Sequence, residues 1–344
     1  MPSAPHRSPA PSVRGGFLLA ACQGGAEAAL CQRQEKVLPQ VTKAAWRRGV
    51  VTFRLGDFDP PDDFFPDLVF ARAVCRSLGQ VTGATDAERA AHAAALAGPT
   101  SWDAIHVWHR DPRSEVDAAV VGASLATAVA CPQTAGGHVA RPGDLILDCV
   151  IDSPDRWWIG WHRAKAPPSC WPGGIYPGSC PDDKVSRAWL KLDEAIATFA
   201  IPLEAGQRAV ELGAAPGGAC QRLLEAGLRV VAVDPALVDE RVGSHERFEQ
   251  WRMRARDVKL KAFRGFDWVV ADMNIDPSST MEALERAVTA PGSRPQGIIA
   301  TLKLPTWARA AELPEWLETF VRWGFTPRAR QLSTGGREVC VVAQ

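Results

Sequence analysis

The segment Val210-Glu211-Leu212-Gly213-Ala214-Ala215-Pro216-Gly217-Gly218 joins a short strand-like stretch to a glycine-rich turn. Residues 209–212 predict a buried strand, and residues 218–226 predict a helix. Glycines let the backbone turn sharply and let a ligand approach without a Cβ in the way. A strand, a turn and a helix in this order indicate an α/β sheet with a binding site at the carboxyl end of the strand.

The chain around this segment repeats the same alternation. Further continuous apolar strands are expected at 230–233, 268–271, 298–302 and 339–343. Helices are expected at 187–199, 279–289 and 313–323. Strands buried on both faces and separated by helices are typical of a mostly parallel sheet, so residues 186–344 are predicted to form a Rossmann-like α/β domain.

The preceding residues have a different character. Short apolar runs, with helices expected at 26–34, 84–97 and 116–130, predict a smaller α+β domain over 15–165. Residues 166–185 are dense in Pro and Gly and predict a linker that packs against its neighbours, while residues 1–14 predict a disordered tail.

Composition narrows the functional classes. The 39 basic and 39 acidic residues cancel, so the chain lacks the basic excess of a general polyanion binder, and RNA affinity would need a local patch. No apolar run is long enough for a transmembrane helix, so no membrane association is expected.

Metal binding is not expected from the sequence. The nine cysteines form no CxxC pair and no zinc-ligand spacing with histidine, and scattered cysteines fit a reducing compartment, here the cytoplasm. His106 and His109 frame a predicted strand, but no third ligand is evident beside them. Both are therefore interpreted as structural.

An acidic residue supports a nucleoside cofactor at the turn. Asp234 ends the next predicted strand, about 20 residues after Gly213, where a carboxylate can accept both hydroxyls of a ribose. The Gly-Lys-Ser/Thr of a phosphate-binding loop and the GxGxxG of a dinucleotide site are both absent. On these residues alone, a helix-capping turn in an unrelated α/β protein remains the alternative.

The sequence of the turn resembles the S-adenosylmethionine (SAM) motif of FtsJ-like RNA ribose 2′-O-methyltransferases. These enzymes use a Lys-Asp-Lys-Glu tetrad, and four residues match it in order: Lys191, Asp272, Lys303 and Glu338. Asp272 and Lys303 each end a predicted strand, so they should face one crevice whatever the family. The resemblance implies that Lys303 is the general base. It also implies that SAM is bound by Glu211, Gly213, Ala214, Pro216, Gly217, Gly218, Asp234, Asp257 and Asp272.

More distant landmarks resemble one subfamily, the ribosomal RNA large subunit methyltransferase M family. They lie at 68–72, 158–160, 171–175, 186–195 and 302–305. The resemblance implies an N-terminal THUMP-like region and a cytidine ribose of 23S rRNA as substrate. The family turn has Cys where Ala215 stands, a position whose side chain SAM binding does not need. Two alternatives remain: methylation of another RNA (tRNA or mRNA), and a non-catalytic RNA-binding or ribosome-assembly factor that keeps the fold.

Candidate RNA contacts lie near the predicted crevice. The basic ones are Arg247, Arg252, Arg254, Arg256, Lys259, Lys261, Arg264, Arg328, Arg330 and Arg337. Trp157, Trp158 and Trp161 could stack on bases, but aromatic residues of this kind belong more often to a core. The sequence predicts no particular oligomeric state.

Overall fold

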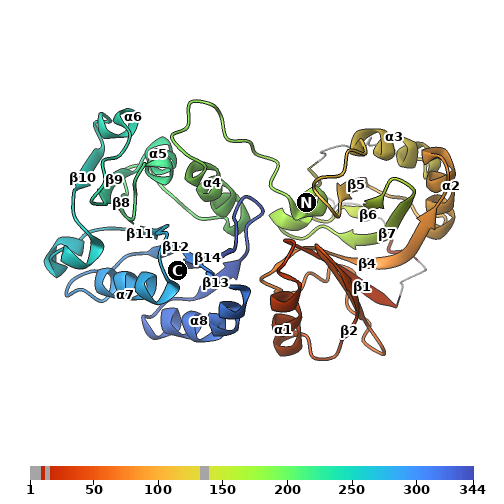
Figure 1. Ribbon diagram of the computed structural model, residues 1–344, viewed down its shortest axis with the longest axis horizontal. Helices are drawn as coiled ribbons and strands as arrows, with labels where there is room; N and C mark the ends of the chain where they lie inside the picture. Colours follow the sequence, from red (N-terminus) through yellow and green to blue (C-terminus); the bar gives the residue numbers. More distant parts are fainter. Residues whose placement is uncertain (1–8, 12–15, 132–138) are drawn as a thin grey trace, which may run out of the picture. The chain divides into compact units, whose positions relative to one another are not determined.

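The computed structural model describes residues 9–11, 16–131 and 139–344, and the chain splits into two compact units, Met1–Pro177 and Gly178–Gln344 (Figure 1). Residues 1–8 and 12–14 of the expected tail lie outside the described residues. Ala10, however, packs against the core of the first unit, and Pro11 is buried. None of the described helices is long and apolar enough to cross a membrane.

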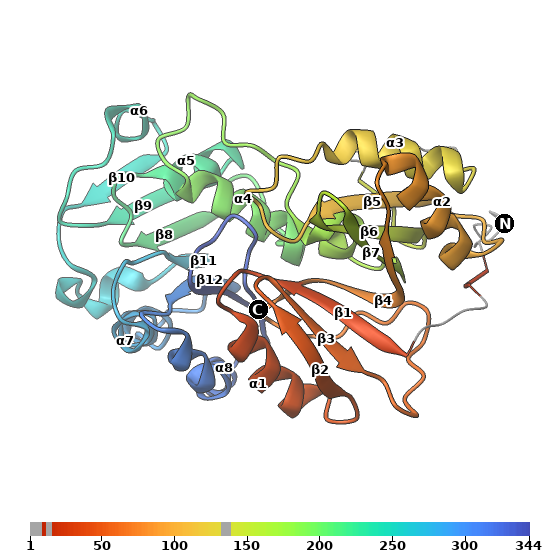
Figure 2. The same ribbon diagram turned by 45° about the vertical axis from the view of Figure 1, so that its right-hand side comes forward.

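Within its described residues, the first unit contains a seven-stranded sheet in the order β2-β3-β1-β4-β7-β6-β5 (Figure 2). The strands are β1 (Phe17–Cys22), β2 (Thr42–Arg47), β3 (Val50–Arg54), β4 (Ala71–Thr82), β5 (Ala104–His109), β6 (Leu145–Ser153) and β7 (Arg156–Arg163). The helices are α1 (Glu27–Val37), α2 (Asp86–Ala97) and α3 (Ala118–Ala128). The β5 and β6 strands are parallel, and the other neighbours are antiparallel, which makes this an α+β unit.

Two strands of this unit differ from the sequence prediction. The mostly apolar residues 68–72 predict a short strand from their sequence, but β4 begins only at Ala71 and continues to Thr82. The β2 strand was not expected, because all six of its residues are exposed and its sequence therefore lacks a buried apolar face.

The two faces of the first sheet carry different layers. On one face, α2 and α3 cover a core that includes Trp157 and Trp161. On the other, short 3₁₀ turns at Pro167–Cys170 and Pro172–Gly174 pack closely, since a Cβ at Gly173 would lie 2.8 Å from the Trp108 ring. Neighbouring residues of a strand point to opposite faces, and Trp108 lies outside the core that contains Val107. Residues 167–174 of the Pro- and Gly-rich segment are thus an ordered layer of this unit.

The second unit, all of whose residues are described, is built on a seven-stranded sheet in the order β10-β9-β8-β11-β12-β14-β13. The strands are β8 (Arg208–Leu212), β9 (Arg229–Val233), β10 (Phe248–Trp251), β11 (Trp268–Ala271), β12 (Gly297–Lys303), β13 (Pro327–Arg330) and β14 (Glu338–Ala343). The helices are α4 (Ala188–Phe199), α5 (Gly218–Glu225), α6 (Glu240–Gly243), α7 (Pro277–Val288) and α8 (Leu313–Arg322). The pairs from β10 to β12 are parallel, while β14 runs antiparallel to β12 and β13.

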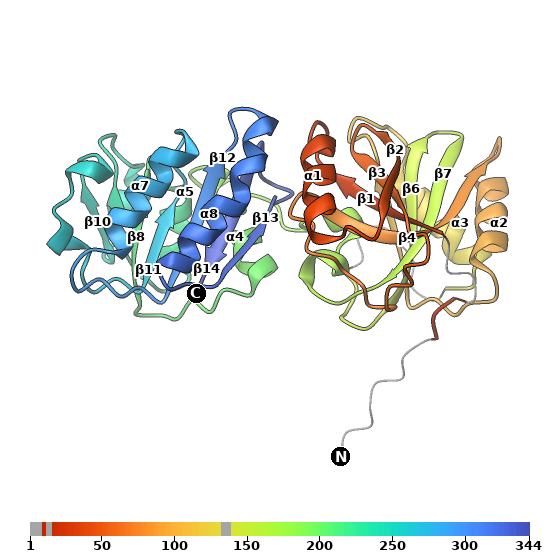
Figure 3. The same ribbon diagram turned by 90° about the horizontal axis from the view of Figure 1, so that it is seen from below.

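Helices cover both faces of this sheet: α4 and α5 lie on one face, and α7 and α8 on the other (Figures 1 and 3). The first face is closed by apolar residues of both helices, among them Leu192 and Leu223, packed on Val270 and Ile299. The carboxyl ends of the parallel strands meet at one edge, which is where such folds bind ligands. The beginning of antiparallel β14 lies at the same edge.

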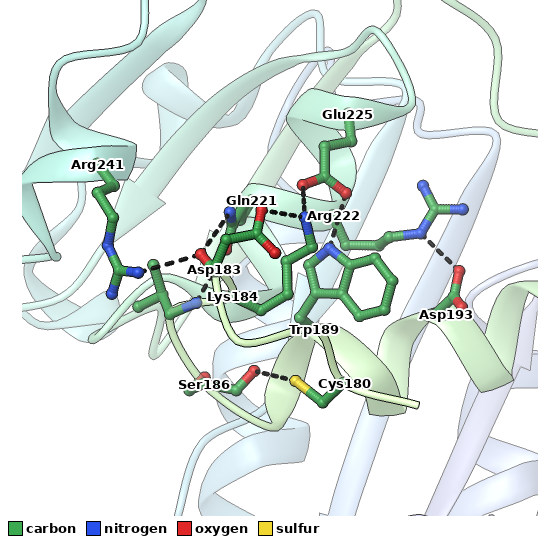
Figure 4. A network of polar contacts seen from close by, with 11 residues as sticks. Cys180, Asp183, Lys184, Ser186, Trp189, Asp193, Gln221, Arg222, Glu225 and Arg241 are labelled. Carbon is green, nitrogen blue, oxygen red and sulfur yellow. Dashed lines mark hydrogen bonds and ion pairs between the residues drawn. The ribbon is translucent and has the colours of Figure 1, made fainter. Parts of the chain in front are cut away.

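A polar network fixes α4 against α5 (Figure 4). The Trp189 indole N–H donates to Glu225 at 2.7 Å, and Lys184 pairs with the same carboxylate at 3.0 Å. One turn further along α4, Asp193 accepts from Arg222 at 2.7 Å. These contacts set the position of α4, and with it the position of Lys191, which lies between Trp189 and Asp193 on this helix.

Candidate active site

Four charged side chains meet at the carboxyl edge of the second sheet. Lys191 projects from α4, Asp272 follows β11, Lys303 ends β12 and Glu338 begins β14. Lys303 Nζ lies 2.7 Å from Asp272 Oδ1 and 2.5 Å from Glu338 Oε2. Lys191 Nζ contacts Asp272 Oδ2 and lies 3.4 Å from Glu338 Oε1. The structure therefore brings together all four residues of the predicted tetrad.

Strand register explains this convergence. Lys303 and Glu338 are direct partners in the antiparallel β12–β14 pair, so their side chains emerge at the same end of the sheet. The β11 and β12 strands run parallel side by side, which puts Asp272 next to Lys303. Only Lys191 comes from outside the sheet, and it depends on the placement of α4.

The electrostatics of the cluster keep Lys303 protonated. Burial is the largest single effect and lowers its pKa, but the Asp272 and Glu338 carboxylates together outweigh burial and raise the pKa above the ordinary lysine value. For Asp272, burial raises the pKa, but Lys191 and Lys303 outweigh it and hold the pKa below its usual range. A lysine acting as a base here must first give up a proton that two carboxylates stabilise.

Glu194 is a buried residue of this region whose contribution the sequence did not reveal. Its carboxylate accepts hydrogen bonds from Ser333 N at 2.7 Å, Thr334 N at 2.8 Å and Thr334 Oγ1 at 2.6 Å. These bonds fix the loop that leads into β14 and Glu338. The available signal was spacing, because residues three apart share a helix face, and Glu194 stands three after Lys191.

Backbone conformation and close packing require glycine at three positions of the turn. Gly213 has a φ of +77°, and a Cβ there would come within 3.2 Å of Met273 Cα. Gly217 has a φ of +110°, in the region that favours glycine. A Cβ at Gly218 would lie 3.0 Å from Trp189 N, where α4 and α5 approach each other. Close packing and backbone conformation therefore account for these glycines without a ligand.

The other predicted cofactor residues occupy several environments. Ala214 is buried within the turn and Pro216 is exposed. Asp234 is half-buried, and its carboxylate accepts from Ala215 N at 3.1 Å and Ala236 N at 2.8 Å, which ties the ends of β8 and β9 together. Asp257 is exposed, in a 3₁₀ turn over Ala255–Asp257.

Glu211 lies beneath the turn. It is buried, and Cys220 Sγ donates to its Oε2 at 2.8 Å. Burial raises the pKa of this carboxyl to about 8. Glu211 therefore supports the β8–α5 turn from inside the protein.

Apolar side chains near the turn fit a nucleoside. Leu237, Met253 and Ile275 are large, exposed residues, and they follow the carboxyl ends of β9, β10 and β11, respectively. Apolar groups grouped at one edge of a sheet commonly mark a ligand site. Together with the Asp234 carboxylate, which suits ribose hydroxyls, this edge has the chemistry that an adenosine moiety requires.

The candidate RNA contacts divide by exposure. Arg252, Arg254, Arg256, Lys259, Lys261 and Arg264 are exposed along 252–264. Arg247, by contrast, is half-buried and donates to main-chain carbonyls of its own unit. Arg264 and Arg328 are exposed, but each also donates to a main-chain carbonyl. Trp157 and Trp161 are fully buried, so they belong to the core of the first unit as the sequence favoured.

Comparisons with known proteins place the second unit in a family. Residues 184–308 match the model of the FtsJ-like methyltransferases. Proteins named ribosomal RNA large subunit methyltransferase M are similar to the chain. That of Azoarcus sp. (strain BH72) is 33% identical over 176 residues, covering 49% of this chain and 46% of the relative. That of Halorhodospira halophila is 29% identical over 293 residues, covering 81% of each.

Coverage differs among these relatives. The similarity to the Azoarcus protein and to the Thauera aminoaromatica protein, which is 34% identical over 52% of this chain, spans about half of their length. Among solved structures, fibrillarin of Aeropyrum pernix with bound SAM aligns with 57% of this chain and 81% of its own, at 14% identity and a TM-score of 0.38. That likeness is too weak to add to the sequence comparisons.

The fold and the family match define the second unit as an FtsJ-like methyltransferase domain, a class whose cofactor is SAM. The chain is a homologue of the ribosomal RNA large subunit methyltransferase M proteins. The resemblance predicted from the sequence is thereby confirmed, as is the Rossmann-like α/β domain preceded by an α+β unit.

The buried Glu211 carboxyl predicts a pH-dependent stability. Its folded-state pKa of about 8 exceeds the ordinary 4.5, so between these values the unfolded chain releases a proton that the folded chain retains. The free energy of unfolding of the wild type should therefore fall, relative to Glu211→Gln, as pH rises from about 5 to about 8, and by a few kcal/mol at roughly pH 8. Urea unfolding of both proteins across this range measures the difference. The matched control is Glu204→Gln, at an exposed position, which should show no such trend; an equally flat difference for Glu211→Gln would contradict the assignment.

Proposed function

We propose that this protein transfers a methyl group from SAM to a ribose 2′-hydroxyl of large-subunit (23S) rRNA, at a cytidine. The observation that supports this function best is the convergence of Lys191, Asp272, Lys303 and Glu338 at the edge where the glycine-rich turn ends β8. A ribose hydroxyl is a weak nucleophile, and this cluster offers a base together with charges that orient it.

Each residue of the cluster has a separate part in the proposed reaction. SAM, when bound, supplies a methyl group activated by the adjacent positive sulfur. Lys303 accepts the proton of the 2′-hydroxyl, and Asp272 and Glu338 hold its Nζ in place. The positive charge of protonated Lys191 lowers the pKa of Lys303 and so helps Lys303 to lose its proton. Holding the hydroxyl in line with the methyl group contributes at least as much as proton removal.

The proposed cofactor site follows the same edge. The Asp234 carboxylate accepts hydrogen bonds from the ribose hydroxyls of SAM, and the Asp257 carboxylate accepts one from the adenine amine. The backbone of Gly213, Ala214 and Pro216–Gly218 lines the site, while Glu211 supports the turn from below. Asp272, which contacts both lysines, would also contribute to the cofactor site. The turn contains no phosphate-binding lysine, which disfavours a nucleoside triphosphate and is consistent with SAM, a cofactor without phosphates.

The RNA substrate is proposed from the relatives and from local charge. The homologues are named for large-subunit ribosomal RNA, and the exposed basic residues over 252–264 can bind phosphates although the whole chain is neutral. We assign RNA affinity to the first unit as well, as a THUMP-like region, because its described residues include no glycine-rich cofactor turn. The expected place of action is the cytoplasm, where rRNA of bacterial cells is made and assembled.

Lys303 gives the most direct test of the chemistry. Lys303→Ala should lower the single-turnover rate by about 10²–10⁴ with SAM affinity nearly unchanged, because it removes only the base. Lys303→Arg should not restore the rate, since a guanidinium stays protonated. The wild-type rate should rise about tenfold per pH unit on the alkaline side, because the neutral lysine is scarce when its pKa is raised. Transfer of labelled methyl groups from SAM to rRNA measures all three.

The control for this test is Lys36→Ala, at an exposed position of α1, which should leave the rate at saturating RNA unchanged. A Lys303→Arg protein with a normal rate and an unaltered pH profile would exclude the base role. SAM binding without methylation of any RNA by the wild type would instead support an assembly factor.

Removing the first unit tests its assigned part. A chain starting at Gly178 contains the whole second sheet and the tetrad, so it should bind SAM as the full chain does. It should methylate full-length rRNA poorly, mainly through a higher KM, because the RNA contacts of the first unit are gone. Calorimetry with S-adenosylhomocysteine and the labelled transfer assay give the two values. Full activity at low rRNA concentration would show that the first unit has another role.

A further inference from the structure

Three metal-binding side chains converge in the first unit, on the face of its sheet that α2 and α3 do not cover. They are His106 on β5, Asp148 on β6 and His162 on β7, and all three are buried. One ligand atom from each lies within 4.8 Å of the others. His106 and Asp148 are direct partners in the parallel β5–β6 register, and His162 follows on the next strand. The topology thus supplies His106 with the partners that were not evident from its neighbours in sequence.

The contacts of His162 require a positive charge between it and Asp148. His162 Nε2 lies 2.7 Å from the Ser169 carbonyl oxygen, which can only accept, so Nε2 carries a hydrogen. His162 Nδ1 lies 2.5 Å from Asp148 Oδ2. A lone pair on Nδ1 would face a negative oxygen in a buried site, so a proton must lie between the two atoms at this separation, and a metal ion could replace the proton only if the two atoms move apart.

The position of His106 bears on whether a proton or a metal ion occupies this site. A proton needs only the His162–Asp148 pair. A metal ion would also use the second imidazole, His106, whose ring centroid is 5.6 Å from that of His162. Two imidazole nitrogens and one carboxylate oxygen form a ligand set that divalent transition metals, and zinc in particular, prefer over oxygen-only sites.

We propose that His106, Asp148 and His162 form a binding site for a divalent transition metal ion, with Zn²⁺ as the best match. Zinc bonds of about 2.0–2.2 Å place two ligand atoms of one ion roughly 3.4 Å apart. The short His162–Asp148 contact would therefore open, and the wider spacing to His106 would close, each by about 1 Å. The Ser169 carbonyl already takes the remaining N–H of His162, as outer partners of metal-bound imidazoles do.

A thiol beside the cluster is the candidate for a fourth ligand. Asp148 is paired in register with Gly160, and a Cβ at Gly160 would lie 2.7 Å from Cys75 Sγ. The missing side chain thus leaves room for the Cys75 thiol beside Asp148. Burial, and then the Asp148 charge, raise the pKa of Cys75, and a metal ion would favour the thiolate that both disfavour. The bound ion would join β4, β5, β6 and β7 beneath the 3₁₀ turn at Pro167–Cys170.

Metal content of the full-length protein tests the site. After dialysis against a weak chelator, the wild type should retain about one zinc per chain by elemental mass spectrometry. Cobalt substitution should give visible absorption bands of a tetrahedral site. His106→Gln and Asp148→Asn keep the size of each side chain and should weaken Zn²⁺ binding by at least about 100-fold. The melting temperature of the wild type should fall with a strong chelator and recover with Zn²⁺.

The matched control is His92→Ala, because His92 is an exposed histidine on α2 and should leave zinc content unchanged. Circular dichroism establishes that each variant is folded. Equal zinc content in wild type, His106→Gln and Asp148→Asn would overturn the proposal, as would a wild-type melting temperature indifferent to zinc and chelator. A proton would then bridge His162 and Asp148.

Discussion

Two lysines and two carboxylates can share a nearly dry sheet edge only because their charges alternate. Lys303 contacts Asp272 and Glu338, and Lys191 contacts the same two carboxylates from α4. These side chains are only 10–19% exposed, so removing one partner leaves a partly shielded charge uncompensated. The antiparallel β14 strand is therefore indispensable, since it brings Glu338 to the edge where the parallel strands end.

The sequence predicted the buried centre of the second unit well and its periphery poorly. The strands of the sheet centre were evident because they are continuous and apolar, and Asp272 and Lys303 could be placed together because strand ends converge. Lys191 and Glu338 were predicted only from the resemblance to the FtsJ-like enzymes. The β10 and β13 strands were not predicted, because each has four residues and lies at an edge of the sheet, where half-exposed positions leave no clear pattern. Glu194 gave only the weak signal of its spacing from Lys191, since its hydrogen bonds to Ser333 and Thr334 depend on tertiary structure.

The first unit shows the same limit in another form. Pro and Gly over 166–185 predicted a linker that packs against its neighbours, but not which contacts it makes: a Cβ at Gly174 would overlap the Arg72 carbonyl. His106, Asp148 and His162 are far apart along the chain, so only strand order reveals that they meet. Local composition predicts elements, whereas polar clusters depend on which strands become neighbours.

We propose that the cluster of Lys191, Asp272, Lys303 and Glu338 catalyses methylation of a ribose of large-subunit rRNA. The most direct measurement maps 2′-O-methylation across rRNA from cells that lack the protein, and from the same cells supplied with the wild type or with Lys303→Ala. We expect one ribose methylation to disappear in these cells, the wild type to restore it and Lys303→Ala not to restore it. An unchanged methylation map in cells lacking the protein, or full restoration by Lys303→Ala, would contradict it.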